Sequence, residues 1–315
     1  MLTAHIALVS QSSATPPESL MEVAAAVQRQ IVRDFSPIWG VEASVQPFAR
    51  LDQVPTGCWP IILRDDLPGQ NAVGLHLDDH GQPLALIQAN NIWSLTASHE
   101  ALEMLADPYG NRVIPGGSLR PGQGVVEYLV EVSDPVASVA NGYSVNGILV
   151  SDFVTPEYFQ HPAPVPGTSY SFTGAVQRPR DVIQGGYVTW REPLSAHWWQ
   201  AQLVAGQLQF SDLGLINDSG LGLRRLVDSR FTPDELIHGV SPDNPYLQAA
   251  LERHASEAGA SAVRARLWQR LVDGAVGQAG TKSGADAPVS KWSSKLKLVQ
   301  EQAPVLHVPP QPPVN

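Results

Sequence analysis

Residues 98–108, SHEALEMLADP, place an imidazole and two carboxylates within five consecutive positions. In a helix, residues i and i+4 are neighbours on one face, so His99 and Glu103 would lie side by side. Imidazole and carboxylate groups both bind divalent metals, and this pair could share one ion. Glu100 would lie beside the pair, where its carboxylate could accept a proton from a metal-bound water.

The residues around this trio favour a helix that is buried on most sides. Its neighbours are mostly apolar, and no Lys or Arg occurs between Asp79 and Arg112. Carboxylates are rarely buried unless they are paired or bind a metal, and a divalent cation would supply the missing charge. The alternative is a surface helix whose histidine and glutamates face water.

The expected helix runs from about residue 92 to about residue 106. Asn90, Asn91 and Ser94 can each cap its start. Pro108 cannot continue it, and the residue before a proline is pushed out of helical geometry. Asp107 continues the series of His99 and Glu103, but Asp-Pro-Tyr-Gly favours a turn residue over a ligand.

A catalytic zinc site needs three protein ligands and one open position, so another ligand must come from elsewhere. The strongest candidate segment is EYLVEVSDP, residues 127–135, whose alternation and β-branched residues predict a strand. Glu131 and Asp134 lie near its end and face opposite ways on a regular strand. One could bind the metal while the other orients His99. In the alternative interpretation, Glu131 is solvated and Asp134-Pro135 is an ordinary turn.

Four sequence blocks resemble the zincin metallopeptidases, and more narrowly a bacterial group with a His-Glu-x-x-Glu motif followed by Asp-Pro. These blocks are AVGLHLDDHGQPLALI (72–87), SHEALEMLADPYGN (98–111), EYLVEVSDP (127–135) and YSVNGILVSDFVTPEYF (143–159). The resemblance covers much of residues 40–230. It implies a zinc peptidase in which His99 and Glu103 are ligands, Glu100 is the general base and residues 131–134 supply the third ligand.

The chain also departs from the common zincin pattern. Glu103 stands where the second histidine is expected. Ala106 and Tyr109 occupy the positions of the glycine and the last histidine of metzincins, and no Met-turn can be assigned.

Composition limits the classes of function. A net charge of −10 over 315 residues argues against non-specific nucleic-acid binding. The single cysteine, Cys58, excludes an internal disulfide and a cysteine zinc cluster, and we interpret it as a structural thiol. No stretch approaches the roughly 20 apolar residues that span a bilayer, and the N-terminus lacks a basic signal-peptide region. We therefore expect a cytoplasmic protein, or one exported by a route that the sequence does not show, with no membrane partner.

The expected fold class is α+β, with a zincin-like mixed sheet, the metal-binding helix, a β-rich region and C-terminal helices. Residues 18–34 have helical periodicity. The expected strands of the sheet are 5–10, 42–48, 60–64, 72–77 and 84–88. Residues 84–88 are either an edge strand that could bind an extended peptide or an internal core strand.

Four regions are expected along the chain: a catalytic domain at 1–165, a β-rich extension at 166–230, a helical region at 231–278 and a disordered tail at 279–315. Asn146-Gly147 predicts a hairpin within residues 143–153. Thr232-Pro233 predicts a helix start, and a second helix should cover about 244–273. The tryptophans of residues 170–215 are expected in the core, although exposed ones could bind glycans or peptides.

Three further side chains, Tyr143, Tyr158 and His161, could donate a proton to a developing oxyanion, although each is also an ordinary structural residue. Taken together, these patterns predict a zinc-dependent peptidase acting on a peptide or protein. Mn²⁺ or Fe²⁺ would also suit carboxylate-rich ligation. The alternative is a non-catalytic binding or accessory protein that uses the aromatic C-terminal half. The oligomeric state is not predicted.

Overall fold

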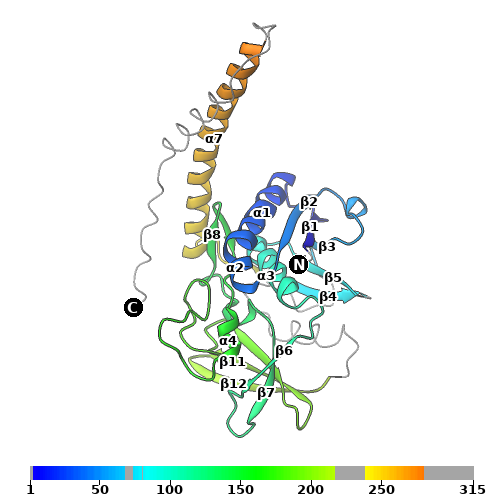
Figure 1. The fold of residues 1–315 in the computed structure, drawn as a ribbon, viewed down its shortest axis with the longest axis vertical. Coiled ribbons are helices and arrows are strands. Elements are labelled where there is room, and N and C mark those ends of the chain that lie inside the picture. Colours follow the sequence, from blue (N-terminus) through cyan, green and yellow to red (C-terminus); the bar gives the residue numbers. More distant parts are fainter. Residues whose placement is uncertain (1–2, 68–73, 80, 217–237, 280–315) are drawn as a thin grey trace. The chain divides into compact units, whose positions relative to one another are not determined.

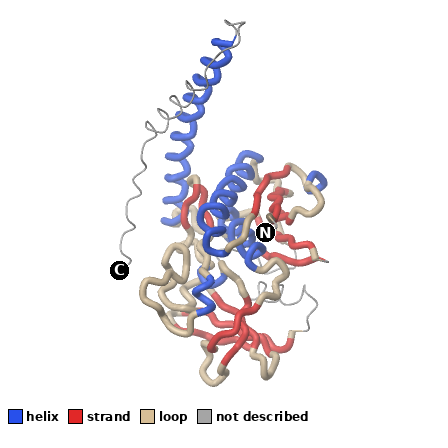
Figure 2. Tube along the Cα trace, viewed as in Figure 1, coloured by secondary structure: helices blue, strands red, loops and turns tan. Residues whose placement is uncertain are grey.

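The computed structural model describes residues 3–67, 74–79, 81–216 and 238–279, with the side chains of 74–79 and 274–279 left aside. These residues form a mixed α+β fold with parallel and antiparallel sheets, which confirms the α+β part of the expected fold class (Figure 1; Figure 2). The chain divides into two units, residues 1–260 and residues 261–315.

The first sheet has the order β2-β1-β3-β5-β4, with β4 antiparallel to β5 and the other neighbours parallel. All five expected strands are present, within about two residues of their predicted ends. Their bounds are β1 Ala4–Ser10, β2 Ala43–Phe48, β3 Trp59–Arg64, β4 Gly74–Asp79 and β5 Gln82–Gln88.

The expectation that residues 84–88 form an edge strand is wrong. These residues belong to β5, which pairs with β3 on one side and with β4 on the other. Strand β4 runs antiparallel to β5, with Asp79 opposite Gln82, and lies at the outer edge of the sheet. The alternative interpretation, an internal strand, is the one that the structure shows.

One helical run covers the first sheet and is longer than predicted. It consists of α1 (Pro17–Gln30), a π-helical segment (Ile31–Phe35) and α2 (Ser36–Trp39). Pro17 occupies the first turn, where its missing N–H costs nothing. The run ends at Gly40, whose φ of 68° is the left-handed conformation that glycine adopts easily.

The predicted metal-binding helix is α3, Trp93–Ala106. None of the three expected caps occupies the N-cap position, which is Ile92. Asn90 instead accepts a hydrogen bond from the backbone N–H of Ile92, and the Ser94 hydroxyl donates to the carbonyl of Leu149. The amide of Asn91 binds the backbone of a distant segment at Val240.

The Asn-Gly hairpin is confirmed. Its strands are β8 (Tyr143–Val145) and β9 (Ile148–Val150). Asn146 and Gly147 have φ values of 53° and 78°, as a two-residue hairpin turn requires.

A second, antiparallel sheet has the order β12-β11-β10-β7-β6. A domain boundary was expected at residue 165, but this sheet contains strands from both sides of it, since β10 pairs with β7. Trp190 and Trp198 are buried, which confirms the core interpretation for these two tryptophans. The bounds are β6 Val113–Gly117, β7 Val125–Leu129, β10 Tyr187–Arg191, β11 His197–Val204 and β12 Gln207–Leu215.

Among the described residues, the last helix is α7, Pro245–Ala279, close to the predicted 244–273. Asn244 accepts hydrogen bonds from the N–H groups of Tyr246 and Leu247 and so caps its start. The predicted helix start at Thr232 lies outside the described residues. Of the tail predicted over 279–315, residue 279 is the last residue of α7, and residues 280–315 lie outside the described part of the chain. No helix within the described part of the chain is both long and apolar enough to cross a membrane.

Asp152 follows β9 and is fully buried. Its carboxylate accepts hydrogen bonds from the N–H of Phe153 and from the N–H and hydroxyl of Thr173. Burial raises the pKa of Asp152 to about 6, because these hydrogen bonds offset only part of the cost of desolvation. The ionised form therefore costs stability in the folded state.

We expect Asp152→Asn to flatten the dependence of stability on pH. The pKa of Asp152 in the folded state lies above the ordinary aspartate value of 3.8. The contribution of Asp152 to stability is therefore full below pH 3.8 and is lost as the pH rises through about 6. Asparagine does not titrate, so the variant lacks this loss. The difference in unfolding free energy between wild type and variant should therefore change by up to about 3 kcal/mol between pH 4 and pH 7. Urea unfolding across this range measures it, with Asp243→Asn at an exposed position as the control. A constant difference between wild type and Asp152→Asn would contradict the prediction.

Candidate metal centre

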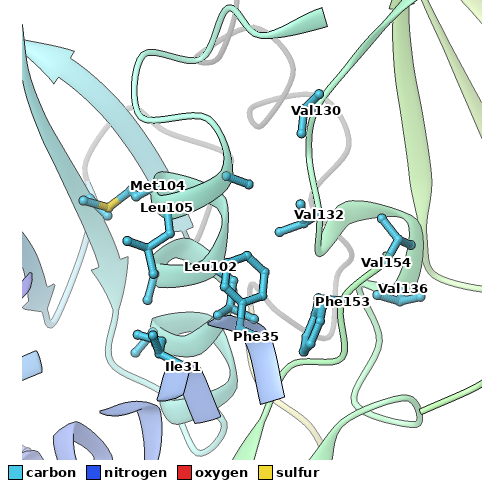
Figure 3. Close-up of a cluster of buried hydrophobic side chains, with 14 of the residues drawn as sticks. Ile31, Phe35, Leu102, Met104, Leu105, Val130, Val132, Val136, Phe153 and Val154 are labelled. Atoms are coloured by element: carbon cyan, nitrogen blue, oxygen red, sulfur yellow. The ribbon is translucent and has the colours of Figure 1, made fainter. Parts of the chain in front are cut away.

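Helix α3 lies inside the core, and every residue from Leu95 to Ala106 is buried. It contacts β4 and β5 of the first sheet, α1 and β9. Figure 3 shows the helix beside the segment that carries Val130, Val132 and Val136. These side chains belong to one apolar cluster that includes residues of both sheets. The His-Glu-x-x-Glu motif is therefore enclosed by protein, and the surface-helix alternative is wrong.

Buried hydrogen bonds hold α3 in place at Ser98, the residue before His99. The Ser98 hydroxyl donates to the side-chain oxygen of Gln30 at 2.7 Å and accepts from the N–H of Ser151 at 3.0 Å. The amide nitrogen of Gln30 donates to the carbonyl of Ser151 at 2.8 Å. Three elements therefore hold one another at this point, which restricts both sliding and rotation of α3.

Three side chains meet next to this anchor. Nε2 of His99 lies 3.3 Å from Oε1 of Glu103 and 3.2 Å from Oδ1 of Asp134. The ligand atoms of all three residues lie within 4.8 Å of one another. Their exposed fractions are 6%, 2% and 1% for His99, Glu103 and Asp134, so this is an interior site.

Asp134 reaches the site because the chain leaves the strand earlier than predicted. Strand β7 ends at Leu129, not near residue 135. The N–H of Ser133 then donates to Oε1 of Glu103, and Asp134 begins a short 3₁₀ turn that ends at Val136. The backbone bond from Val154 to the carbonyl of Val132 holds this segment in place.

Glu131, the other candidate for the third ligand, is also buried but is not part of the three-residue group. Glu131 and Asp134 would face opposite ways only on a regular strand, and residues 130–133 do not form one. Nδ1 of His99 has no hydrogen-bond partner within the described part of the chain. Neither Glu131 nor another described carboxylate therefore accepts a hydrogen bond from that atom, contrary to the expectation that one of them orients His99.

The electrostatics of the group depend on His99. Burial disfavours its charged form, but the charge of Glu103 and the hydrogen bond with Asp134 favour it more, and the pKa of His99 lies well above its usual value. The negative charge of Glu100 also raises the pKa of His99. A proton on the imidazole would therefore partly offset the charge of the two carboxylates.

The distances suit a metal better than a shared proton. The single Nε2–H faces two oxygens at 3.2 and 3.3 Å, whereas charged N–H···O bonds are usually about 2.7–2.9 Å long. Tetrahedral ligands with metal bonds of about 2.0–2.1 Å lie about 3.3 Å apart. The buried group of His99, Glu103 and Asp134 could hold a metal ion.

The remaining candidate residues have other roles in the structure. Asp107 accepts the N–H of Arg112 at 2.8 Å in the turn after α3, as the turn interpretation predicted. The Tyr143 hydroxyl donates to Asp34, and the Tyr158 hydroxyl donates to the carbonyl of Asp181. His161 forms an ion pair with Glu157. Tyr143, Tyr158 and His161 are thus each committed to a partner other than the three-residue group.

Sequence reasoning missed Gly186, which lies just before β10 and against the turn of Asp134. A Cβ atom at this position would lie 2.1 Å from the carbonyl oxygen of Pro135 and 3.0 Å from that of Asp134. Only glycine permits this approach of two backbones. The Gly185-Gly186 pair was the available signal, but it does not reveal which segment comes close.

Comparison with models of known protein families, with curated proteins and with solved structures found no match.

We expect Gly186→Ala to weaken metal binding, because the new methyl group must displace the Asp134-Pro135 backbone and with it the Asp134 carboxylate. The predicted loss is at least tenfold in affinity, with a lower midpoint of thermal unfolding. Gly117→Ala in β6 is the matched control, since its Cβ would meet no atom within 4 Å. Competition with a chromogenic chelator measures the affinity. Equal affinities for the two variants would show that the contact does not position Asp134.

Proposed function

We propose that this chain is a metal-dependent peptidase in which His99, Glu103 and Asp134 bind a zinc ion. The observation that carries the proposal is the convergence of these three side chains in the core, from a helical turn and a distant segment. One nitrogen and two oxygen ligands suit Zn²⁺ and leave a fourth position of a tetrahedron for water. Mn²⁺ and Fe²⁺ accept similar ligands and are the alternative metals.

The order of the elements supports a zincin-like assignment. A mixed sheet precedes the helix that carries His99, and its outermost strand β4 runs antiparallel to β5. An edge strand presents backbone N–H and C=O groups that an extended peptide can pair with. We infer that β4, in place of residues 84–88, is the strand beside which a peptide substrate lies.

A zinc ion held by this group would polarise a scissile carbonyl and lower the pKa of a bound water towards neutrality. Glu100 is assigned the role of general base. It is 4% exposed, follows His99 directly, and its charge acts on the imidazole. A carboxylate in this position accepts a proton from the attacking water and passes it to the leaving amine.

One observation favours an alternative function. All three of these residues are at most 6% exposed, and structural metal sites are typically closed in this way. In that case the chain is a non-catalytic binding or accessory protein whose metal stabilises the junction of α3 and the segment at Asp134. The two functions differ in what the protein loses when the metal is removed.

We expect Glu100→Gln to retain about one metal ion per chain but to lose peptide cleavage by at least a hundredfold, because an amide cannot accept the proton. His99→Ala should lose both the metal and the activity. Metal content by elemental analysis and cleavage of an unstructured protein such as casein are the two measurements. Glu131→Gln is the control, since this carboxylate lies outside the three-residue group. Undiminished cleavage by Glu100→Gln would refute the mechanism.

A chelator should abolish cleavage while the fold persists, since both sheets and α3 are packed by an extensive apolar cluster. Far-ultraviolet circular dichroism before and after EDTA treatment tests the fold, and added Zn²⁺ should restore activity. Unfolding on chelation would instead support the structural metal of the alternative function.

A further inference from the structure

The charges of this chain are divided unevenly along its length. Residues 1–260 carry 13 Lys and Arg against 27 Asp and Glu, whereas residues 261–315 carry 7 against 3. All four lysines fall within residues 282–297. The C-terminal unit is therefore positively charged in a protein whose overall charge is −10. Such an asymmetry is typical of a segment that binds an anionic partner.

The described part of this unit is the second half of α7, and it exposes an apolar face. Val263, Leu267 and Leu271 follow one another at intervals of four, and Trp268 and Val272 form the adjacent row. Four of the five are strongly exposed: 55% for Val263, 40% for Leu267, 58% for Trp268 and 53% for Val272. These five residues are called the apolar face of α7.

The opposite side of the same helix is polar. Arg266, Gln269, Arg270 and Asp273 share it, and Gln269 donates a hydrogen bond to Asp273. Arg264 lies at the first turn of the apolar face, where its guanidinium donates a hydrogen bond to the Ser261 hydroxyl. A long arginine side chain at such a place can extend its charge towards water while its stem stays in apolar surroundings.

We propose that the apolar face of α7 lies on an anionic lipid surface. A helix with Trp, Leu and Val on one face and arginines at its polar side is the pattern of interfacial helices. The positive charge of residues 261–315 complements anionic headgroups. A second copy of the chain fits less well, because two such helices would bring like charges together. The expectation of no membrane partner rested on the lack of a spanning stretch, which an interfacial helix does not need.

Flotation of the full-length protein with vesicles tests this proposal. We expect binding to vesicles of phosphatidylcholine mixed with phosphatidylglycerol and at least tenfold weaker binding to phosphatidylcholine alone. NaCl at about 0.5 M should weaken the binding, because it screens the attraction between arginines and headgroups. Leu267→Glu combined with Leu271→Glu should reduce binding at least tenfold, since both apolar side chains would lose their place in the lipid.

The matched control is Ala262→Glu combined with Gln269→Glu, which adds the same charge to the same helix on its polar side. This variant should lose several-fold less binding than Leu267→Glu with Leu271→Glu, and circular dichroism should show equal helix content for both. No flotation with any vesicle, or equal loss in both variants, would overturn the proposal. It would also be overturned if light scattering showed a dimer that only the apolar-face variant disrupts, or if the protein bound duplex DNA but no vesicle.

Discussion

Charge compensation inside an apolar core is the constraint on which this structure depends. Two carboxylates and an imidazole place their ligand atoms within 4.8 Å of one another, among side chains that are almost all buried. Like charges at such separations need a positive charge between them, and a proton on His99 or a divalent metal supplies it. The two carboxylates raise the pKa of His99 for this reason, and the three groups are spaced so that one cation can lie between them.

The surrounding elements hold the three groups at that separation. The bonds of Ser98 with Gln30 and Ser151 place the helical turn that carries His99. The glycine at 186 allows a strand of the second sheet to press against the turn of Asp134. The site therefore lies where the two sheets share one core, and neither sheet could form it alone. Precise placement of ligands by a supporting shell is what metal sites require.

Much of the fold could be predicted from sequence because its elements have strong local signals. Alternating apolar residues located the strands of the first sheet, Pro108 located the end of α3, and Asn146-Gly147 located the hairpin. The i, i+4 spacing also placed His99 and Glu103 together, since that relation is local. The choice between Glu131 and Asp134 was not local. It depended on where β7 ends, which is decided by tertiary bonds such as that from Ser133 to Glu103. The same reason explains why the pairing of β10 with β7 could not be predicted.

The π-helical segment at Ile31–Phe35 has a consequence for the placement of the site. A π turn holds one more residue than an α turn, so every side chain beyond it is rotated by about 100° relative to an uninterrupted α-helix. Trp39 lies beyond this widened turn, and its indole N–H donates to the carbonyl of Val154 at 3.0 Å. Val154 in turn is bonded to Val132, two residues before Asp134. A single inserted residue in the first helix thus sets the direction of the Trp39 side chain, whose hydrogen bonds continue through Val154 to the segment that carries Asp134.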